Sequence, residues 1–264
     1  MMDAITRAAA ALWEAGQTGV ACAPVRSIIG DSDIETAYAV QERNTERRLK
    51  DGARLVGRKI GLTARSVQAQ LGVAQPDYGM LFHDMDVPNG GEVAPGRLLQ
   101  PKVEAEVAFI MGRDLDDDRL TSADVMSAIA WTVPALEIVD SRVEGWNIRI
   151  TDTVADNASS GLFVLGHEMR RLDAVDLLTC GMALERNGEL VSAGAGAACL
   201  GSPINATLWL ARVMAKAGRP LRAGDVVLSG ALGPMVPATP GAVFEARIEG
   251  LGAVRVGFGK EDSQ

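Results

Sequence analysis

The chain has 264 residues, 47% of them hydrophobic, and a formal net charge of −8 at pH 7. This is enough hydrophobic material for one large buried core or two smaller ones. The basic residues form no block, which argues against a nucleic acid as a partner. No apolar run approaches the roughly 18 residues that a membrane-spanning helix needs, so we expect no membrane partner either.

The three cysteines, Cys22, Cys180 and Cys199, are widely spaced along the chain. They form neither a CxxC pair typical of zinc sites nor an even set typical of a disulfide framework. The N-terminal segment MMDAITRAAAALWEAG carries Asp3 and Glu14 among its apolar residues, which indicates an amphipathic helix and not a signal peptide. Reduced thiols and this N-terminus favour a cytoplasmic location.

The first 50 residues predict helices. Ser32 is followed three residues later by Glu35, a capping-box signature ahead of a helix that Gly52 ends. Residues 53–61 alternate like a strand. Next, Thr63 could cap a short helix that ends at Gly72.

Beyond residue 73 the chain predicts mainly loops and short strands. Thr121 and Ser202 each have the pattern of a helix cap, and Pro203 follows Ser202 at the first helical position. Asn187-Gly188 predicts a tight hairpin. The predicted strands are 100–115, 134–140, 161–166, 181–191, 225–230, 244–250 and 253–259.

These elements predict an α+β fold in one domain, residues 1–264. Its N-terminal part, 1–52, is mostly helical, and its body, 53–264, is rich in β-strands. Because the strands recur at short intervals, we expect a rolled or closed, largely antiparallel sheet.

Two glutamates share one face of the predicted strand in QPKVEAEVAFIMGRDL, residues 100–115. Side chains alternate along a strand, so Glu104 and Glu106 point the same way, about 7 Å apart along the chain. Glu137 lies in a comparable apolar stretch, VPALEIV. Buried carboxylates are costly unless they are paired or coordinated, so three of them suggest a shared cation.

An all-oxygen ligand set favours Mg²⁺ or Mn²⁺ over zinc, and Lys59 is the nearest basic residue in a comparable strand. From spacing alone, however, an ordinary solvated sheet face is the more common interpretation of Glu-x-Glu. His83 and His167 belong to no catalytic sequence pattern, and we expect both to lie in loops or turns. The polar run DTVADNASSG, residues 152–161, predicts a loop, either an ordinary one or one that lines a polar pocket.

Five segments of the chain, in order, resemble a known family. They are GRKIGLTARSVQAQLGVAQPDYGMLF, LQPKVEAEVAF, PALEIVDSR, DTVADNASSG and GDVVLSGALGPM. The family is that of the bacterial 2-hydroxypenta-2,4-dienoate (2-oxopent-4-enoate) hydratases, in the hydratase/decarboxylase branch of the fumarylacetoacetate hydrolase superfamily. The resemblance extends from about residue 30 to residue 258.

The resemblance implies a mixed β-roll with helices packed outside, and a divalent ion, Mg²⁺ or Mn²⁺, held by Glu104, Glu106 and Glu137. It also implies a substrate pocket lined by Lys59, Asp77, Leu71 and Ser159. Of these four residues, Lys59 and Asp77 are expected to handle the protons.

The implied reaction adds water to 2-hydroxypenta-2,4-dienoate and gives 4-hydroxy-2-oxopentanoate, in the meta-cleavage degradation of aromatic compounds. The implied assembly is a homo-oligomer, pentamer-based, with an association with the downstream aldolase. Three alternatives stay open: a 4-oxalocrotonate decarboxylase, a hydratase of a longer-tailed dienoate, and a non-catalytic partner subunit of a pathway enzyme. The intact set of glutamates with Lys59 argues against the last.

Overall fold

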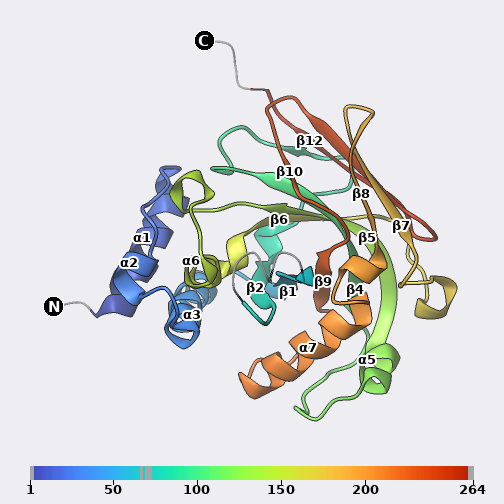
Figure 1. Ribbon diagram of the computed structural model, residues 1–264, viewed down its shortest axis with the longest axis horizontal. Coiled ribbons are helices and arrows are strands. Elements are labelled where there is room, and N and C mark those ends of the chain that lie inside the picture. The colour runs from blue at the N-terminus through green and yellow to red at the C-terminus, as the bar shows by residue number, and fades with distance from the viewer. Residues whose placement is uncertain (1–2, 66–67, 69–72, 261–264) are drawn as a thin grey trace.

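Two β-sheets with helices around them make up the part of the chain that the computed structural model describes, residues 3–65, 68 and 73–260 (Figure 1). The first sheet has the strand order β2-β1-β9-β4-β5-β6, and β10 pairs with β4. Its described pairings are antiparallel, except that β1 runs parallel to β9. The strands are β1 (Leu55–Gly61), β2 (Asp77–Phe82), β4 (Lys102–Met111), β5 (Ile129–Val139), β6 (Ser160–Leu165), β9 (Val226–Ala231) and β10 (Val236–Pro237).

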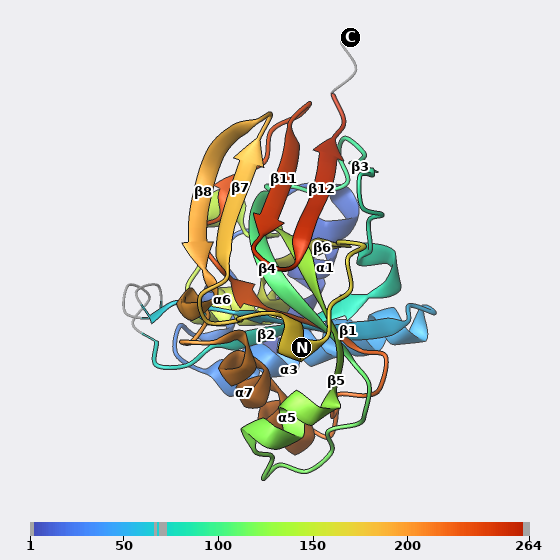
Figure 2. The same cartoon turned by 90° about the vertical axis from the view of Figure 1, so that its right-hand side faces the viewer.

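The second sheet has the order β3-β12-β11-β7-β8, and Figure 2 shows β8, β7, β11 and β12 side by side. The turn between β7 and β8 is the predicted hairpin, because both Asn187 and Gly188 have positive φ angles. The strands are β3 (Glu92–Val93), β7 (Gly181–Arg186), β8 (Glu189–Ala195), β11 (Val243–Ile248) and β12 (Gly252–Phe258).

The helices gather in two places (Figure 1). The N-terminal helices lie on one side together with α6, whereas α5 and α7 pack against each other elsewhere. The predicted α+β fold, a mixed β-roll with a helical N-terminal part and outer helices, is confirmed. The helices are α1 (Ala4–Thr18), α2 (Arg26–Ile29), α3 (Ile34–Lys50), α5 (Ser122–Ala128), α6 (Ile150–Ala155) and α7 (Pro203–Lys216).

Helix α3 begins at a different cap from the predicted one. The carboxylate of Asp33, not the hydroxyl of Ser32, accepts the backbone N–H of Thr36 at 2.9 Å. The same carboxylate accepts the Thr36 hydroxyl at 2.6 Å. Aspartate caps helices as well as serine does, and Asp33 stands one residue nearer to the first helical turn.

The caps predicted at Thr121 and Ser202 are confirmed, since both side chains accept a backbone N–H from the first turn. The helix that Thr121 caps is short, because it ends at Ala128 and strand β5 begins at Ile129. Most of the short helix predicted after Thr63 lies outside the described residues.

The run 152–161 is not the loop that the sequence predicted. Its first residues belong to α6, and a 3-10 turn, η3 (Asn157–Ser159), follows. The buried carboxylate of Asp152 accepts the backbone N–H groups of Arg26 (2.8 Å) and Arg149 (2.9 Å) and the Arg26 guanidinium (2.5 Å). These bonds fix the start of α6 and account for a polar run inside a folded element.

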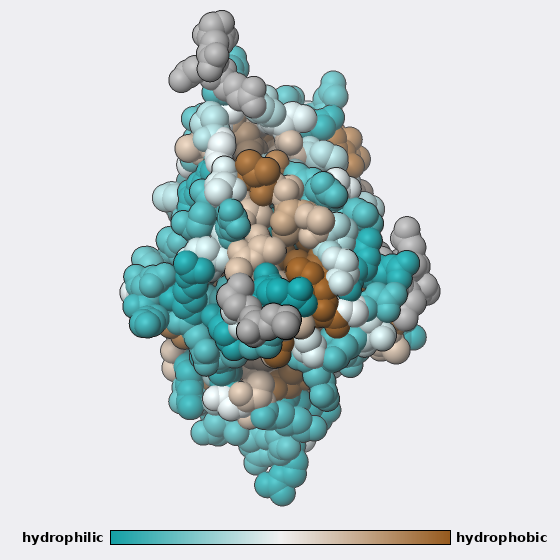
Figure 3. Space-filling model, turned by 90° about the vertical axis from the view of Figure 1, so that its left-hand side faces the viewer, coloured by the Kyte–Doolittle hydropathy of each residue, from teal (hydrophilic) through white to brown (hydrophobic). Residues whose placement is uncertain are grey.

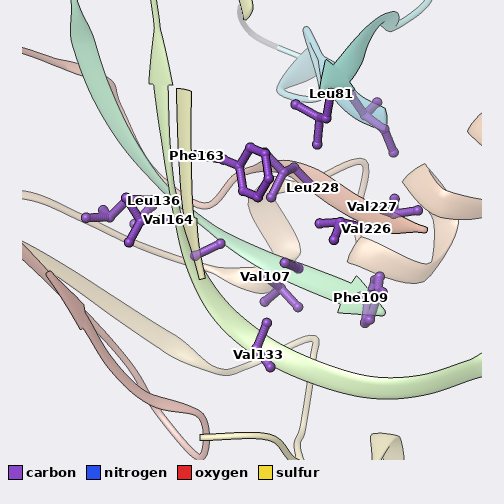
Figure 4. Close-up of a cluster of buried hydrophobic side chains, with 14 of the residues drawn as sticks. Leu81, Val107, Phe109, Val133, Leu136, Phe163, Val164, Val226, Val227 and Leu228 are labelled. Carbon is purple, nitrogen blue, oxygen red and sulfur yellow. The ribbon is translucent and has the colours of Figure 1, made fainter. Parts of the chain in front are cut away.

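Two clusters of buried hydrophobic side chains form the core. The larger one fills the space around the sheets and includes Phe109, Val133 and Phe163 (Figure 4). The smaller one joins the N-terminal helices to α6. Tyr38 packs against both clusters and stacks on Tyr78 with 4.4 Å between ring centroids. The helical N-terminal part is therefore packed onto the β-rich body.

The face that carries the N-terminal helices is mainly hydrophilic, with hydrophobic residues gathered along its middle (Figure 3). Among the described residues, no helix combines the length and the apolar character needed to cross a membrane.

Candidate metal centre and substrate cavity

Three glutamates from two neighbouring strands converge on one point. Glu104 on β4 lies directly opposite Glu137 on β5 in the antiparallel register, and Glu106 lies two residues further along β4 on the same face. One carboxylate oxygen from each residue lies within 4.8 Å of the others. Like charges directly opposite each other destabilise a sheet, so this arrangement needs a compensating positive charge.

The burial of these carboxylates excludes the solvated sheet face that spacing alone favours. Glu106 and Glu137 are at most 1% exposed, and Glu104 is half-buried. Oε2 of Glu106 accepts the backbone N–H of Gly230 at 2.7 Å. Oε1 of Glu106 and Oε2 of Glu137 are buried without a hydrogen-bond partner among the described residues. Buried oxygens of this kind are ready to accept a cation.

The electrostatics of the three groups lead to the same conclusion. Burial, followed by the charge of Glu137, raises the pKa of Glu104 to about 8 and raises that of Glu106 well above its ordinary range. The carboxylates therefore resist being charged together unless a cation joins them. An oxygen-only ligand set matches a hard divalent ion such as Mg²⁺ or Mn²⁺, so the residues present fit this kind of metal.

Lys59, on β1, supplies one positive charge beside the glutamates. Its Nζ atom lies 2.9 Å from Oε1 of Glu137, and its side chain is only 3% exposed. Burial alone lowers the pKa of Lys59, but the charges of Glu137 and Asp77, with that of Glu104, outweigh it and raise the pKa. The ammonium group is thus held in its charged form.

Asp77 is the first residue of β2 and pairs with Gly61 on β1. Burial raises the pKa of the Asp77 carboxyl to about 6, although the charge of Lys59 opposes this shift. A side chain at position 61 would overlap Oδ1 of Asp77, so the glycine makes room for this carboxyl. The fold therefore brings Asp77 and Lys59 to the same site.

Ser159 belongs to a turn with unusual backbone geometry. Asn157, Ala158 and Ser159 all have φ angles between 51° and 55°, the left-handed region that non-glycine residues rarely adopt. The amide of Asn157 holds this turn, since it exchanges two hydrogen bonds with the backbone of Met80, at 2.7 and 2.9 Å. Backbone strain of this kind concentrates at functional sites.

A cavity of about 450 Å³ connects these groups. Four polar residues identified from the sequence line it: Lys59, Asp77, Glu104 and Ser159. Much of the remaining wall is apolar and includes Leu62, Val139, Trp146, Ile148, Leu232 and Met235. A larger groove of about 830 Å³ lies beside α1 and α3, but its lining includes none of the three glutamates and neither Lys59 nor Asp77. The residues that line a cavity, and not its volume, therefore identify the candidate site.

Of the residues predicted from the sequence, Leu71 lies outside the described residues. Several residues that contribute to the site were not predicted. Gly230 donates its N–H to Glu106, Thr153 places its hydroxyl 3.2 Å from that of Ser159, and Trp146 forms part of the cavity wall. Thr153 lies in the polar run 152–161 and Gly230 lies in the segment GDVVLSGALGPM, whereas Trp146 lies in none of the segments singled out from the sequence.

The comparisons place the chain in a family. The family model described as fumarylacetoacetate (FAA) hydrolase C-terminal matches residues 57–258, and the chain belongs to this family. It is 63% identical to a protein named TodF product hydratase from Pseudomonas putida strain F1, over 97% of this chain and 96% of that protein. It is 59% identical to 2-keto-4-pentenoate hydratase 1 of Dechloromonas aromatica, over 96% of this chain and 97% of that protein.

Among solved structures, the chain is similar to 4-oxalocrotonate decarboxylase from Pseudomonas putida G7, complexed with magnesium and adipate. The TM-score is 0.90 and the identity is 35%, with 96% of this chain and 97% of that chain covered. The likeness therefore includes nearly the whole of both chains.

Proposed function

We propose that the protein is a metal-dependent hydro-lyase that adds water to 2-hydroxypenta-2,4-dienoate and forms 4-hydroxy-2-oxopentanoate, in the meta-cleavage degradation of aromatic compounds. The observation that carries this proposal is the buried set of three glutamates beside Lys59, at the polar part of a largely apolar cavity. The hydratase names of the relatives described above give the reaction class.

Glu104, Glu106 and Glu137 are the residues that would hold Mg²⁺ or Mn²⁺. When bound, such an ion supplies Lewis-acid stabilisation for negative charge on the C2 oxygen of the substrate. Three carboxylates against a divalent ion leave a net charge of −1, and the substrate carboxylate adds another. Lys59, 2.9 Å from Glu137, offsets part of this charge.

The reaction needs four proton transfers: the C2 hydroxyl of the dienoate loses one proton as C5 gains one, and the water that adds to C4 loses one as C3 gains one. Lys59 and Asp77 are the groups that we assign to these transfers, because both line the cavity. The charged Lys59 ammonium has protons to donate, and the Asp77 carboxyl, whose pKa burial raises to about 6, can accept and return one. The Ser159 hydroxyl lies at the same wall and is assigned to substrate binding. Leu71 keeps the substrate-binding role that the family resemblance implies.

The decarboxylase alternative is supported by the close structural likeness to 4-oxalocrotonate decarboxylase. Against it, Lys59 is the only cationic side chain among the described residues that line the cavity. A dicarboxylate would need a second cationic partner for its terminal group. The apolar wall suits a short, uncharged tail better.

One experiment separates the candidate functions. The Mg²⁺-loaded protein is mixed with 2-hydroxypenta-2,4-dienoate and, separately, with 4-oxalocrotonate, while dienoate absorbance and CO₂ release are followed. We expect rapid loss of the dienoate without CO₂. Release of CO₂ from 4-oxalocrotonate as the dominant activity would favour the decarboxylase, and no turnover of either compound would favour a non-catalytic partner subunit.

We further infer that residues 1–264 fold as a single domain, because Tyr38 joins the core of the N-terminal part to that of the body. A single cooperative unfolding transition would support this.

The homo-oligomer, pentamer-based, and its association with the downstream aldolase are also proposals. Light scattering of the purified protein, alone and mixed with the aldolase, tests both. The cytoplasmic location rests on the three unpaired cysteines, and cell fractionation tests it.

A further inference from the structure

The indole of Trp146 stands between two cavities. It lines the catalytic cavity of about 450 Å³ and also a second cavity of about 420 Å³. The wall of the second cavity is rich in proline and other apolar residues, among them Pro95, Leu98, Pro101, Pro237 and Phe258. No residue of the proposed metal set lines this second cavity.

Several contacts hold this indole in place. Its Nε1–H donates to the carbonyl oxygen of Gln100 at 2.9 Å. The ammonium of Lys102 lies 4.0 Å from the ring centroid, in a cation–π geometry. The backbone is also specialised, since Gly145 and Trp146 have φ angles of 60° and 55° in succession. A bulky residue adopts such a conformation only where its surroundings impose it.

The position of the indole relative to the metal site follows from the strand register. Lys102 pairs with Val139, and this pair lies two residues along the strands from the pair formed by Glu104 and Glu137. Two residues correspond to about 7 Å along a strand and keep side chains on the same face. Trp146 contacts Lys102 and lines the cavity beside Val139. Its ring therefore lies one two-residue strand repeat beyond the metal ligands.

The ring also separates the ammonium group of Lys102 from the catalytic cavity. Lys102 lines the second cavity but not the catalytic one, whereas the indole lines both and contacts the Lys102 ammonium group. With the ring present, the described wall near Trp146 offers apolar contacts from Val139 and Ile148. Without it, the two cavities would join and a cation would face the tail of a longer ligand.

We propose that Trp146 is a specificity-determining residue, a wall that limits the length of the substrate tail and shields Lys102 from it. The proposal rests on the hydratase function proposed above and names its substrate class: short dienoates without a terminal carboxylate. Longer tails are excluded by the ring. A terminal carboxylate finds no cationic partner while the ring covers Lys102.

The test measures binding as well as turnover. Adipate and hexanoate both have six carbons and differ only in the terminal carboxylate, so calorimetry with the Mg²⁺-loaded protein separates length from charge. We expect Trp146→Ala to bind adipate at least 10-fold more tightly than the wild type does. Adding Lys102→Met should remove most of this gain while leaving any gain for hexanoate. Trp146→Phe keeps a flat ring and should behave like the wild type.

Turnover gives a second readout. The kcat/KM ratio of 2-hydroxyhexa-2,4-dienoate to 2-hydroxypenta-2,4-dienoate should rise at least 10-fold in Trp146→Ala, mainly through KM. Trp146→Leu, a smaller change in volume, should show the same trend and serves if the alanine variant does not fold. Circular dichroism and Mg²⁺ titration confirm that each variant is folded and binds metal.

Affinities for both acids and a substrate ratio within twofold of wild type, in a folded variant that binds Mg²⁺, would overturn the proposal. An equal gain for adipate and hexanoate would overturn the role given to Lys102. If the wild type does not convert the pentadienoate, the proposed hydratase function fails, whereas the binding of the two acids still tests the wall on its own.

Discussion

The Nζ atom of Lys59 lies 2.9 Å from Oε1 of Glu137, and both side chains are almost completely buried. This ion pair joins strand β1 to strand β5 across the candidate metal centre. Removing one partner of a buried pair leaves an uncompensated charge, which typically costs about 3–5 kcal/mol. Lys59 is therefore a structural as well as a chemical part of the site.

We expect Lys59→Met to lower turnover by roughly 10²- to 10⁴-fold, the range for losing a positioned acid or base. An ammonium cannot ligate a metal, so the variant should still bind Mg²⁺, and Mg²⁺ should offset part of the lost stability. Steady-state kinetics and thermal melts with and without Mg²⁺ measure these effects. The matched control, Lys50→Met on the exposed end of α3, should change stability by no more than about 0.5 kcal/mol. A kcat within about twofold of wild type would transfer the proton handling to Asp77.

Removal of the metal should abolish activity and lower thermal stability. A ligand that binds only the folded state stabilises it by about 2.7 kcal/mol at 100 times its dissociation constant. Dialysis against a chelator, followed by addition of Mg²⁺ or Mn²⁺, should first lose and then recover turnover. Full activity in a sample shown by elemental analysis to be metal-free would contradict the proposed chemistry.

Glu106→Gln should weaken Mg²⁺ binding by at least about 10-fold, since even the loss of an outer partner of a metal site costs 10- to 100-fold. The fold should survive, because the amide oxygen can still accept the N–H of Gly230 and one repelling charge is gone. Glu189→Gln, at an exposed position on β8, is the control and should leave the affinity unchanged. Unchanged affinity in the Glu106 variant would remove this residue from the ligand set.

Metal affinity should fall as the solution becomes more acidic. Burial and the charge of Glu137 raise the pKa of Glu104 to about 8 in the metal-free protein, so this carboxyl holds a proton below that pH. Metal binding requires the carboxylate and must release the proton. Each unit of pH below 8 should therefore weaken Mg²⁺ binding by up to about 10-fold per proton released. Calorimetry in buffers of different ionisation enthalpy measures that number, and pH-independent affinity between pH 6 and 8 would exclude such coupling.

The raised pKa of Glu104 also makes the stability of the metal-free fold depend on pH. This dependence runs opposite to that of the metal affinity. When a carboxyl has a higher pKa in the folded state than in the unfolded chain, the folded state becomes less stable as the pH rises between the two values. The contribution of Glu104 should thus make the metal-free protein less stable from about pH 4.5 towards pH 8. Added Mg²⁺ should reverse this trend, which a series of thermal melts can show.

The sequence predicted the local features of this molecule better than those that depend on contacts between distant segments. Alternation along 100–115 correctly placed Glu104 and Glu106 on one face, because side-chain direction in a strand is a local property. Their partnership with Glu137 and Lys59 depends on strand pairing between distant segments, which local pattern does not specify. The resemblance to a family supplied that information instead.

The features that sequence reasoning missed were imposed by distant partners. Asp152 is bound by Arg26, and the first residues of the run 152–161, which predicts a loop, belong to α6. The left-handed turn at Ala158 and Ser159 is held by bonds between Asn157 and Met80, although neither alanine nor serine favours that conformation. Trp146 stands in no local pattern, and only the packed structure shows that it separates two cavities.

Gly61 offers a test of Asp77 that leaves the carboxyl itself unaltered. A Cβ at position 61 would overlap Oδ1 of Asp77, so Gly61→Ala should push the carboxyl out of place. A displacement of about 1 Å at a reacting group can cost about 10²-fold in rate. We therefore expect kcat to fall by roughly that factor while Mg²⁺ affinity stays the same, because the three glutamates do not move.

The matched control for this variant is Gly16→Ala in helix α1. The nearest atom to a Cβ there is Cγ of Arg142, at 4.0 Å, so the methyl group meets no obstacle. Alanine in a helix interior is more favourable than glycine by roughly 0.5–1 kcal/mol, and this variant should be slightly more stable and fully active. If Gly61→Ala also kept a wild-type kcat, Asp77 would not need its observed position. Proton handling would then rest on Lys59 alone.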